Sequence, residues 1–255
     1  MNPIIAIFTS SLGKKYLMAI TGVILSLFVL GHMLGNLQVF LDPYYINAYA
    51  YKLQHLPYGL LWVIRFVLLI TLIIHVWVSV VLTIENRKAR PEDYRHKSTA
   101  AATLASRTMR VTGVVVFLFI LFHLAHFTIR NVPGHEYNAV IVDASGAEHD
   151  VHVVLTTPDG KTVKDAYGND KEVHNAHAMM IAGFSYWWIS AIYIVATALL
   201  SRHLAHGVSS MFQSVGLRNS GSRKYLDPIA NVYGIVVFAG FAAIPAAVLL
   251  GLLTL

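Results

Sequence analysis

The sequence contains 13 histidines, as many as its 13 Asp and Glu residues together. Several of them lie inside long apolar stretches: His32, His75, His123, His126, His203 and His206. Polar groups at membrane depth cost free energy and usually serve a function. A hydrogen bond to a neighbouring helix would explain a single such residue equally well. One central histidine on each of four consecutive stretches instead favours a shared ligand site.

The depths of these histidines sort them into two layers. At about 1.5 Å per helical residue, His32 and His123 lie about 25 Å from the charged residues that precede their stretches. His75 and His203 lie no more than about 20 Å from the same side. The sequence therefore predicts two pairs at two heights, His32 with His123 and His75 with His203.

An internal repeat relates the first and third stretches. Residues 18–32 and 109–123 share the frame M-x-[IV]-T-G-V-x-x-x-L-F-[VI]-L-x-H. In both copies the threonine of Thr-Gly precedes the histidine by 11 residues, so the two side chains lie on nearly the same helical face. The adjacent glycine allows a flat ring or another helix to approach. Simple helix packing explains the glycines equally well.

The ligand chemistry favours haem. Zinc usually takes four ligands, often including Cys or a carboxylate, but the chain has no Cys and the apolar stretches contain no Asp or Glu. Haem takes two axial ligands on opposite faces and an apolar slot. We therefore expect two bis-histidine b haems, with iron ligands His32, His75, His123 and His203 and no catalytic side chain. Closed axial positions favour electron transfer over oxygen activation.

Two further histidines compete for the same roles. His126 follows His123 by three residues, and His206 follows His203 by three, so each pair shares one helical face about 5 Å apart. Neither pair can approach one iron from opposite sides. The repeat selects His123, and depth selects His203. His126 and His206 are then expected nearer the helix ends, bonded to a haem propionate, a quinone or water, or as plain interfacial histidines.

The elements that position these residues are five expected transmembrane helices in one domain, 1–255. Uncharged stretches of the required length, about 20 residues, predict helices over about 16–41, 58–84, 108–130, 178–212 and 228–254. The composition agrees, because 56% of residues are hydrophobic and only 13% charged, against about 25% charged in soluble domains. This excludes a disordered chain and argues against a soluble enzyme. The absence of Cys excludes a disulfide scaffold and cysteine-ligated cofactors. The predicted fold class is an all-α membrane protein forming a haem-binding bundle.

The positive-inside rule gives the orientation. Most of the 19 Lys and Arg residues fall on one side of the predicted helices, which predicts a cytoplasmic N-terminus and an external C-terminus. The exceptions are Lys52, Arg65, Arg130, Lys161, Lys164 and Lys171. The basic loop 85–110, on the cytoplasmic side, is expected to meet lipid headgroups or a partner protein. The aromatic connection 42–61 is expected at headgroup level.

The connection 131–174 is predicted to form a small β-hairpin cap outside the membrane. Its strand-like segments are Tyr137–Val142 and Val151–Thr156. Turn signals follow each of them, at Ser145-Gly146 and at residues 158–160 (Pro-Asp-Gly).

Together these features resemble the cytochrome b membrane-anchor subunit of succinate:quinone oxidoreductases (succinate dehydrogenase and fumarate reductase), in its single-chain, five-helix, di-haem type. The resemblance covers all five helices but not the loop 131–174. In the family's fourth helix the haem histidine precedes one glycine by four residues and a second by thirteen, as His203 does here. The segments that carry the resemblance are Gly31-His32-Met-Leu-Gly-Asn36, Ile74-His75-Val-Trp77, Arg110-Val-Thr-Gly113 with His123, and His203-Leu-Ala-His-Gly207 with Met211-Phe-Gln-Ser-Val-Gly216.

The resemblance implies partners and a place in respiration. An FAD-containing flavoprotein subunit would oxidise succinate or reduce fumarate, and an iron–sulfur subunit would exchange electrons with this anchor. The chain would then reduce or oxidise a membrane quinone (menaquinone or ubiquinone), linking the tricarboxylic acid cycle to the respiratory chain in a bacterial cytoplasmic membrane. The haem of His75 and His203 would face the iron–sulfur subunit, and that of His32 and His123 would lie across the membrane. No nucleic acid partner is expected.

The resemblance also directs attention to charged groups near the external ends of the helices. Family members that oxidise menaquinol on the external side are thought to use a carboxylate there. Asp42 is the carboxylate in the first external connection, with Gln54 and His55 near the aligned region. Arg65 is expected either to pair with a haem propionate or to anchor a lipid headgroup.

Two other functions compete with this one. The first is the di-haem cytochrome b subunit of another quinone-linked dehydrogenase, such as a formate dehydrogenase or hydrogenase. The quinol:cytochrome c type carries two ligands on each of two helices, unlike the single ligands on four helices here. The second is a transporter with a histidine relay, which predicts broken, charged helices or inverted repeats. The repeat found here runs in the same direction in both copies.

Overall fold

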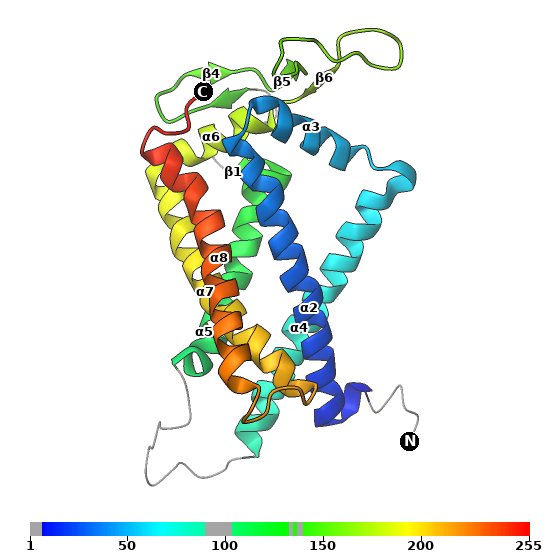
Figure 1. The fold of residues 1–255 in the computed structure, drawn as a ribbon, viewed down its shortest axis with the longest axis vertical. Coiled ribbons are helices and arrows are strands. Elements are labelled where there is room, and N and C mark those ends of the chain that lie inside the picture. Colours follow the sequence, from blue (N-terminus) through cyan, green and yellow to red (C-terminus); the bar gives the residue numbers. More distant parts are fainter. Residues whose placement is uncertain (1–6, 90–103, 133–134, 137–139) are drawn as a thin grey trace. The chain divides into compact units, whose positions relative to one another are not determined.

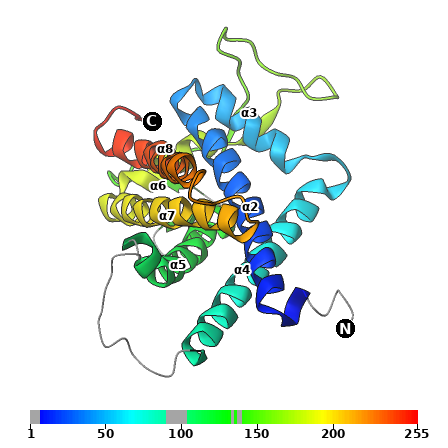
Figure 2. The ribbon, with the colours of Figure 1, turned by 60° about the horizontal axis from the view of Figure 1, so that its bottom comes forward.

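The computed structural model describes residues 7–89, 104–132, 135–136 and 140–255. In this part of the chain, five helices are long and apolar enough to cross a membrane, and they dominate the ribbon in Figure 1 and, from a second direction, in Figure 2. They are α2 (Ser11–Asn36), α4 (Leu60–Lys88), α5 (Leu104–His123), α7 (Trp187–Ser214) and α8 (Arg223–Leu249).

Large apolar side chains lie exposed along these helices. Leu27, Phe66, Val111 and Ile235 each expose more than half of their surface. Extended apolar surface of this kind is uncommon on soluble monomers and fits contact with lipid. These are the features of a multi-pass membrane protein, as the composition predicted.

Two of these helices begin earlier than predicted because charged residues in their first turns are paired. Helix α2 begins at Ser11 rather than near residue 16, and its buried Lys14 forms an ion pair with Glu85 of α4. Helix α8 begins at Arg223 rather than near 228, and its Asp227 accepts hydrogen bonds from Arg218 at 2.8 and 2.9 Å. Pairing offsets part of the desolvation cost, so a charge does not end a helix here.

The fourth predicted helix is interrupted. Helix α6 (Ala176–Ser185) begins earlier than predicted, because the Asn175 side chain accepts the Ala178 N–H at its first turn. At Tyr186 the backbone is extended (φ −77°, ψ 107°), and α7 begins at the next residue.

The aromatic connection between α2 and α4 contains a helix that was not predicted. After the short 3₁₀ turn η1 (Leu37–Phe40), α3 spans Pro43–Gln54, and the short turn η2 (Pro57–Gly59) precedes α4. The Asp42 side chain accepts the Tyr44 N–H at 2.9 Å, and proline occupies the first helical position. Aspartate before proline is a common start signal, so the sequence did carry this information.

Between the π-helix η3 (Leu124–Ile129) and α6 the chain forms three small antiparallel strand pairs. They are β1 (Asn131–Val132) with β2 (His135–Glu136), β3 (Ile141–Val142) with β4 (Glu148–His149), and β5 (His152–Val154) with β6 (Glu172–His174). The predicted turn at Ser145-Gly146 is confirmed, with Gly146 at φ 87°. The start of the predicted strand Tyr137–Val142 lies outside the described residues.

The chain divides into two compact units. Unit 1 comprises Met1–Leu30, Trp62–Gly113 and Ser201–Ile235, and unit 2 comprises Gly31–Leu61, Val114–Leu200 and Val236–Leu255. The core of unit 2 is a cluster of buried apolar side chains: Val39, Ile46, Ala176, Ile181, Phe184, Ile189, Tyr193 and Ile244. In unit 1, the Ser26 hydroxyl donates to Tyr233 at 2.8 Å and joins α2 to α8.

Helices α7 and α8 also meet closely in unit 1, at Gly234. A Cβ atom there would lie 2.7 Å from the backbone oxygen of Ser201 and 3.2 Å from the Cβ of Ala205. Backbone atoms cannot move aside as the end of a flexible side chain can. Only glycine therefore fits this contact.

We predict that Gly234→Ala lowers the unfolding temperature of the chain in detergent, because overpacking of this kind costs about 1–3 kcal/mol. Gly31→Ala is the matched control, since no described atom lies within 4 Å of the Cβ it would add. Equal unfolding temperatures for the two variants would show that α7 and α8 do not meet as described.

Candidate functional site: two histidine pairs

Unit 2 brings together His32 from α2 and His123 from the end of α5. Their ring centroids lie 5.7 Å apart, with the ring planes at 82°. The His32 ring also lies 6.0 Å from the ring of Phe241 on α8. We call these two histidines the unit 2 pair.

Unit 1 brings together His75 from α4 and His203 from α7. Their ring centroids lie 6.5 Å apart, with the planes at 64°. We call them the unit 1 pair. The histidines that were paired by their estimated depth in the membrane thus lie ring to ring in the structure, and each pair lies within one unit.

Both separations fit two imidazoles on opposite sides of one metal ion. A metal–imidazole bond is about 2 Å long, so two opposed nitrogens lie about 4 Å apart. Each ring centroid lies about 1 Å behind its nitrogen, which gives a centroid separation of about 6 Å. The observed 5.7 and 6.5 Å bracket this value. Among the described residues, no group of three or more His, Cys, Asp or Glu side chains is arranged to hold a metal ion.

The Thr-Gly of the first repeat copy contacts a histidine of the unit 1 pair. The Thr21 hydroxyl lies 2.7 Å from the Leu17 carbonyl and 3.0 Å from Nδ1 of His75. When its single proton goes to the carbonyl, the hydroxyl oxygen accepts the Nδ1–H of His75, and the Nε2 lone pair of His75 is then available to a metal. Beside it, a Cβ on Gly22 would lie 3.8 Å from Cε1 of His75.

The second repeat copy makes the corresponding contact with the other member of the pair. The Thr112 hydroxyl donates to the Met109 carbonyl at 3.0 Å, and Nδ1 of His203 lies 3.5 Å from the same oxygen. A Cβ on Gly113 would lie 3.4 Å from Cε1 of His203. Each Thr-Gly therefore forms a platform for the histidine of another helix, a role that the repeat alone did not reveal.

The two competing histidines have other neighbours. His206 is half-buried, and its Nε2 lies 3.2 Å from the Ser210 hydroxyl one turn further along α7. His126 is fully buried in η3, and its Nδ1 lies 3.1 Å from the Tyr193 hydroxyl. His126 thus lies near the end of the span Thr108–Ile129, as expected, with its ring enclosed by protein. The Tyr193 contact was missed because a tyrosine in an apolar helix carries no distinctive sequence signal.

The charged and polar residues singled out near the external helix ends have local roles in the structure. Asp42 caps α3. The His55 ring stacks on Tyr51, with the centroids 3.9 Å apart. The Arg65 guanidinium lies over the Trp62 ring, 5.0 Å from its centroid. Much of the basic loop 85–110, the predicted docking segment, lies outside the described residues.

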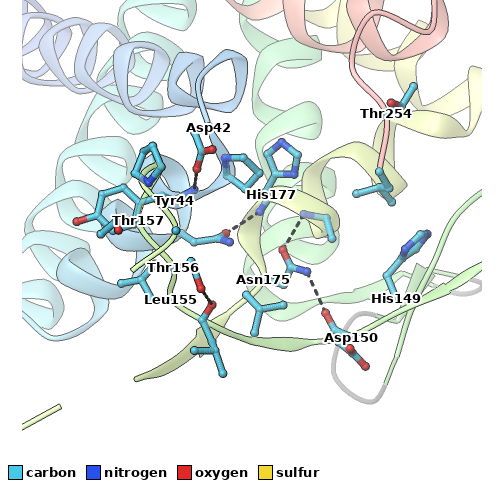
Figure 3. A pocket seen from close by; sticks show the side chains of 18 of the residues that line it. Asp42, Tyr44, His149, Asp150, Leu155, Thr156, Thr157, Asn175, His177 and Thr254 are labelled. Carbon is cyan, nitrogen blue, oxygen red and sulfur yellow. Dashed lines mark hydrogen bonds between the residues drawn. The ribbon is translucent and has the colours of Figure 1, made fainter. Parts of the chain in front are cut away.

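Unit 2 also contains an open pocket of about 740 Å³, lined by both polar and apolar residues. Figure 3 shows Asp42 and His177 on one side of it and Asp150 and His149 on the other. The side chain of Asn47 accepts the backbone N–H of His177 at 3.0 Å and ties α3 to α6. Burial lowers the pKa of His177, and the carboxylate of Asp42 opposes that change.

The strand pair β5–β6 places His152 directly opposite His174, with the ring centroids 5.9 Å apart. A guanidinium nitrogen of Arg130 lies 3.2 Å from Nε2 of His174. Burial, together with the charges of Arg130 and His152, lowers the pKa of His174 to about 4. His174 is therefore neutral in the folded chain at neutral pH.

The chain matches no known family model, no curated protein sequence and no solved structure. Its function therefore has to be argued from the histidine pairs and the residues that hold them.

His174 predicts acid sensitivity. The unfolded chain takes up a proton at this residue near pH 6.5, whereas the folded chain does so only near pH 4. The folded state therefore loses stability as the pH falls from about 6.5 to about 4. We expect the unfolding temperature in detergent to fall more steeply over this range for the unmodified chain than for His174→Gln. Parallel curves would contradict this account of His174.

Proposed function

We propose that the chain is the membrane-anchor cytochrome b subunit of a succinate dehydrogenase or fumarate reductase complex. It would carry electrons through two b haems between an iron–sulfur subunit and membrane quinone. The observation that carries the proposal is the presence of two histidine pairs, each ring to ring at a separation suited to two opposed axial ligands.

The residues present fit a pair of b haems. The unit 1 pair would hold one and the unit 2 pair the other, each through imidazole nitrogens from two helices. A bis-histidine b haem, when bound, supplies a one-electron carrier with both axial positions closed. The chain's own part is to fix the rings and keep water away. The hydroxyls of Thr21 and Thr112 lie 3.0 and 3.5 Å from the Nδ1 atoms of His75 and His203. Aromatic rings contact the unit 2 pair, among them Phe119, Phe127 and Phe241.

The partners follow from the family resemblance. An FAD flavoprotein would carry the dicarboxylate chemistry, and an iron–sulfur subunit would exchange electrons with the haem of the unit 1 pair at the cytoplasmic face. The haem of the unit 2 pair would lie toward the external face. The charge pattern of the sequence supports a cytoplasmic N-terminus, and the family resemblance supports a bacterial inner membrane.

A di-haem cytochrome b of another quinone-linked dehydrogenase is the alternative. It would use the same histidine pairs, so the identity of the electron donor separates the two functions. The centroid separations of the two pairs, 5.7 and 6.5 Å, suit two ligands of one metal ion and favour the haem proposal over a proton-relay transporter.

Replacing either histidine of a pair should remove the same haem. The purified chain should bind about two b haems, and His75→Ala and His203→Ala should each lose the same one. His32→Ala and His123→Ala should each lose the other. A pyridine haemochrome assay gives the count, and redox titration of the visible spectrum identifies the haem.

His206→Ala is the matched control for His203→Ala, because His206 bonds to Ser210. It should retain both haems. If His206→Ala lost the haem of the unit 1 pair while His203→Ala kept it, the ligand on α7 would be wrong by one turn. Loss of different haems by two members of one pair would refute the pairing itself.

The partner can be tested separately. The chain, expressed with a flavoprotein and an iron–sulfur subunit of a succinate dehydrogenase, should form a complex in which succinate reduces the haem of the unit 1 pair. In the same complex, His75→Ala should abolish that reduction. Reduction by formate or hydrogen with their own dehydrogenase subunits, but not by succinate, would support the alternative instead.

A further inference from the structure

Tyr193 bridges two histidines in unit 2. It lies on α7 with only 6% of its surface exposed. Its hydroxyl is 3.3 Å from Nδ1 of His123 and 3.1 Å from Nδ1 of His126. The proposed function assigns no role to Tyr193 or to the fully buried His126.

The position of this hydroxyl is fixed by the packing of its ring. Four phenylalanine rings surround the Tyr193 ring, with centroids between 4.9 and 6.0 Å away. They are Phe119, Phe122, Phe127 and Phe184. Side chains packed in this way keep a single rotamer, so the hydroxyl cannot turn away from the two histidines.

Hydrogen-bond counting allows two arrangements, and one of them leaves His123 free to bind a metal through Nε2. A tyrosine hydroxyl has one proton to donate, and a neutral histidine has one N–H and one lone pair. When the hydroxyl donates to Nδ1 of His126, its oxygen accepts the Nδ1–H of His123. His123 then presents its Nε2 lone pair as a ligand, as His75 does beside Thr21.

The backbone supports the same arrangement. His123 is the last residue of α5, and His126 lies in the π-helix η3 that follows it. Single π turns inside helices are frequent at functional sites, because they change the direction of side chains. Here both histidines reach one hydroxyl from neighbouring turns.

We propose that Tyr193, oriented by His126, is the positioning residue that holds His123 as an Nε2 ligand of the unit 2 haem. The inference rests on the proposed function. The partner of His123 is a phenol bonded to a second imidazole, whereas His75 and His203 lie against aliphatic hydroxyls of the repeat. Removal of the phenol hydroxyl should therefore affect the unit 2 haem alone.

The test compares three conservative variants of the haem-loaded chain. Tyr193→Phe keeps the ring and removes the hydroxyl. Thr21→Val removes the acceptor of His75 and serves as the positive control for the unit 1 pair. Tyr233→Phe removes a buried interhelical hydroxyl bond to Ser26 and serves as the control away from both pairs. The readouts are the electron paramagnetic resonance signal, the midpoint potential and the haem affinity of each site.

Tyr193→Phe should shift the signal of the unit 2 haem, raise its midpoint potential and weaken its retention about 10- to 100-fold. The potential rises because His123, without an acceptor for its N–H, becomes a less basic ligand and stabilises the ferric form less. Thr21→Val should produce the same changes in the unit 1 haem only. His126→Gln should change the unit 2 haem in the same direction as Tyr193→Phe, with little further change in the double variant.

The proposal is overturned if Tyr193→Phe leaves both haems as unchanged as Tyr233→Phe does, or if it affects the unit 1 haem instead. His126→Gln gives an independent reading should Tyr193→Phe fail to fold, and an unchanged unit 2 haem in that variant also overturns the role of His126. Absence of haem from the unmodified chain would contradict the proposed function itself, which separates the two failures.

Discussion

The structure is organised by the needs of an imidazole placed among apolar helices. A neutral histidine has one N–H that requires an acceptor and one lone pair that requires a donor or a metal, and neither is supplied by lipid or by aliphatic side chains. The Thr21 hydroxyl lies 3.0 Å from Nδ1 of His75, and the Tyr193 hydroxyl lies 3.3 Å from Nδ1 of His123. Each hydroxyl oxygen is placed to accept the Nδ1–H of its histidine, and the Nε2 atom of that histidine is then free for a metal.

The histidine contacts explain the internal repeat. Each copy carries two functions on one helical face, a Thr-Gly platform and a histidine. The platforms receive the rings of His75 and His203 in unit 1, while the repeat's own histidines, His32 and His123, form the pair in unit 2. Glycine at 113 lets the His203 ring lie close to the backbone of α5, since even a Cβ there would already be in contact with the ring, 3.4 Å from Cε1. One sequence frame, used twice, thus serves both pairs.

The five long helices and the two histidine pairings could be predicted from the sequence. The length of an apolar stretch and the depth of a histidine within it depend only on positions along the chain. The starts of α2 and α8 could not be predicted, because Lys14 and Asp227 are kept inside these helices by partners outside them, Glu85 of α4 and Arg218. The platforms were seen as a repeat but not as contacts, since their histidines lie on other helices. Tyr193 was missed for the same reason: its importance depends on three-dimensional neighbours. The cofactor, the partners and the orientation in the membrane remain proposals.

The central claim is that each histidine pair closes the two axial positions of one b haem. Low-temperature electron paramagnetic resonance of the purified, oxidised, unmodified chain tests it most directly. The account predicts two low-spin ferric signals of the bis-imidazole type, about equal in amount, and no high-spin signal from an open axial position. A chain purified from haem-replete cells without haem, or with a single or high-spin haem, would contradict it.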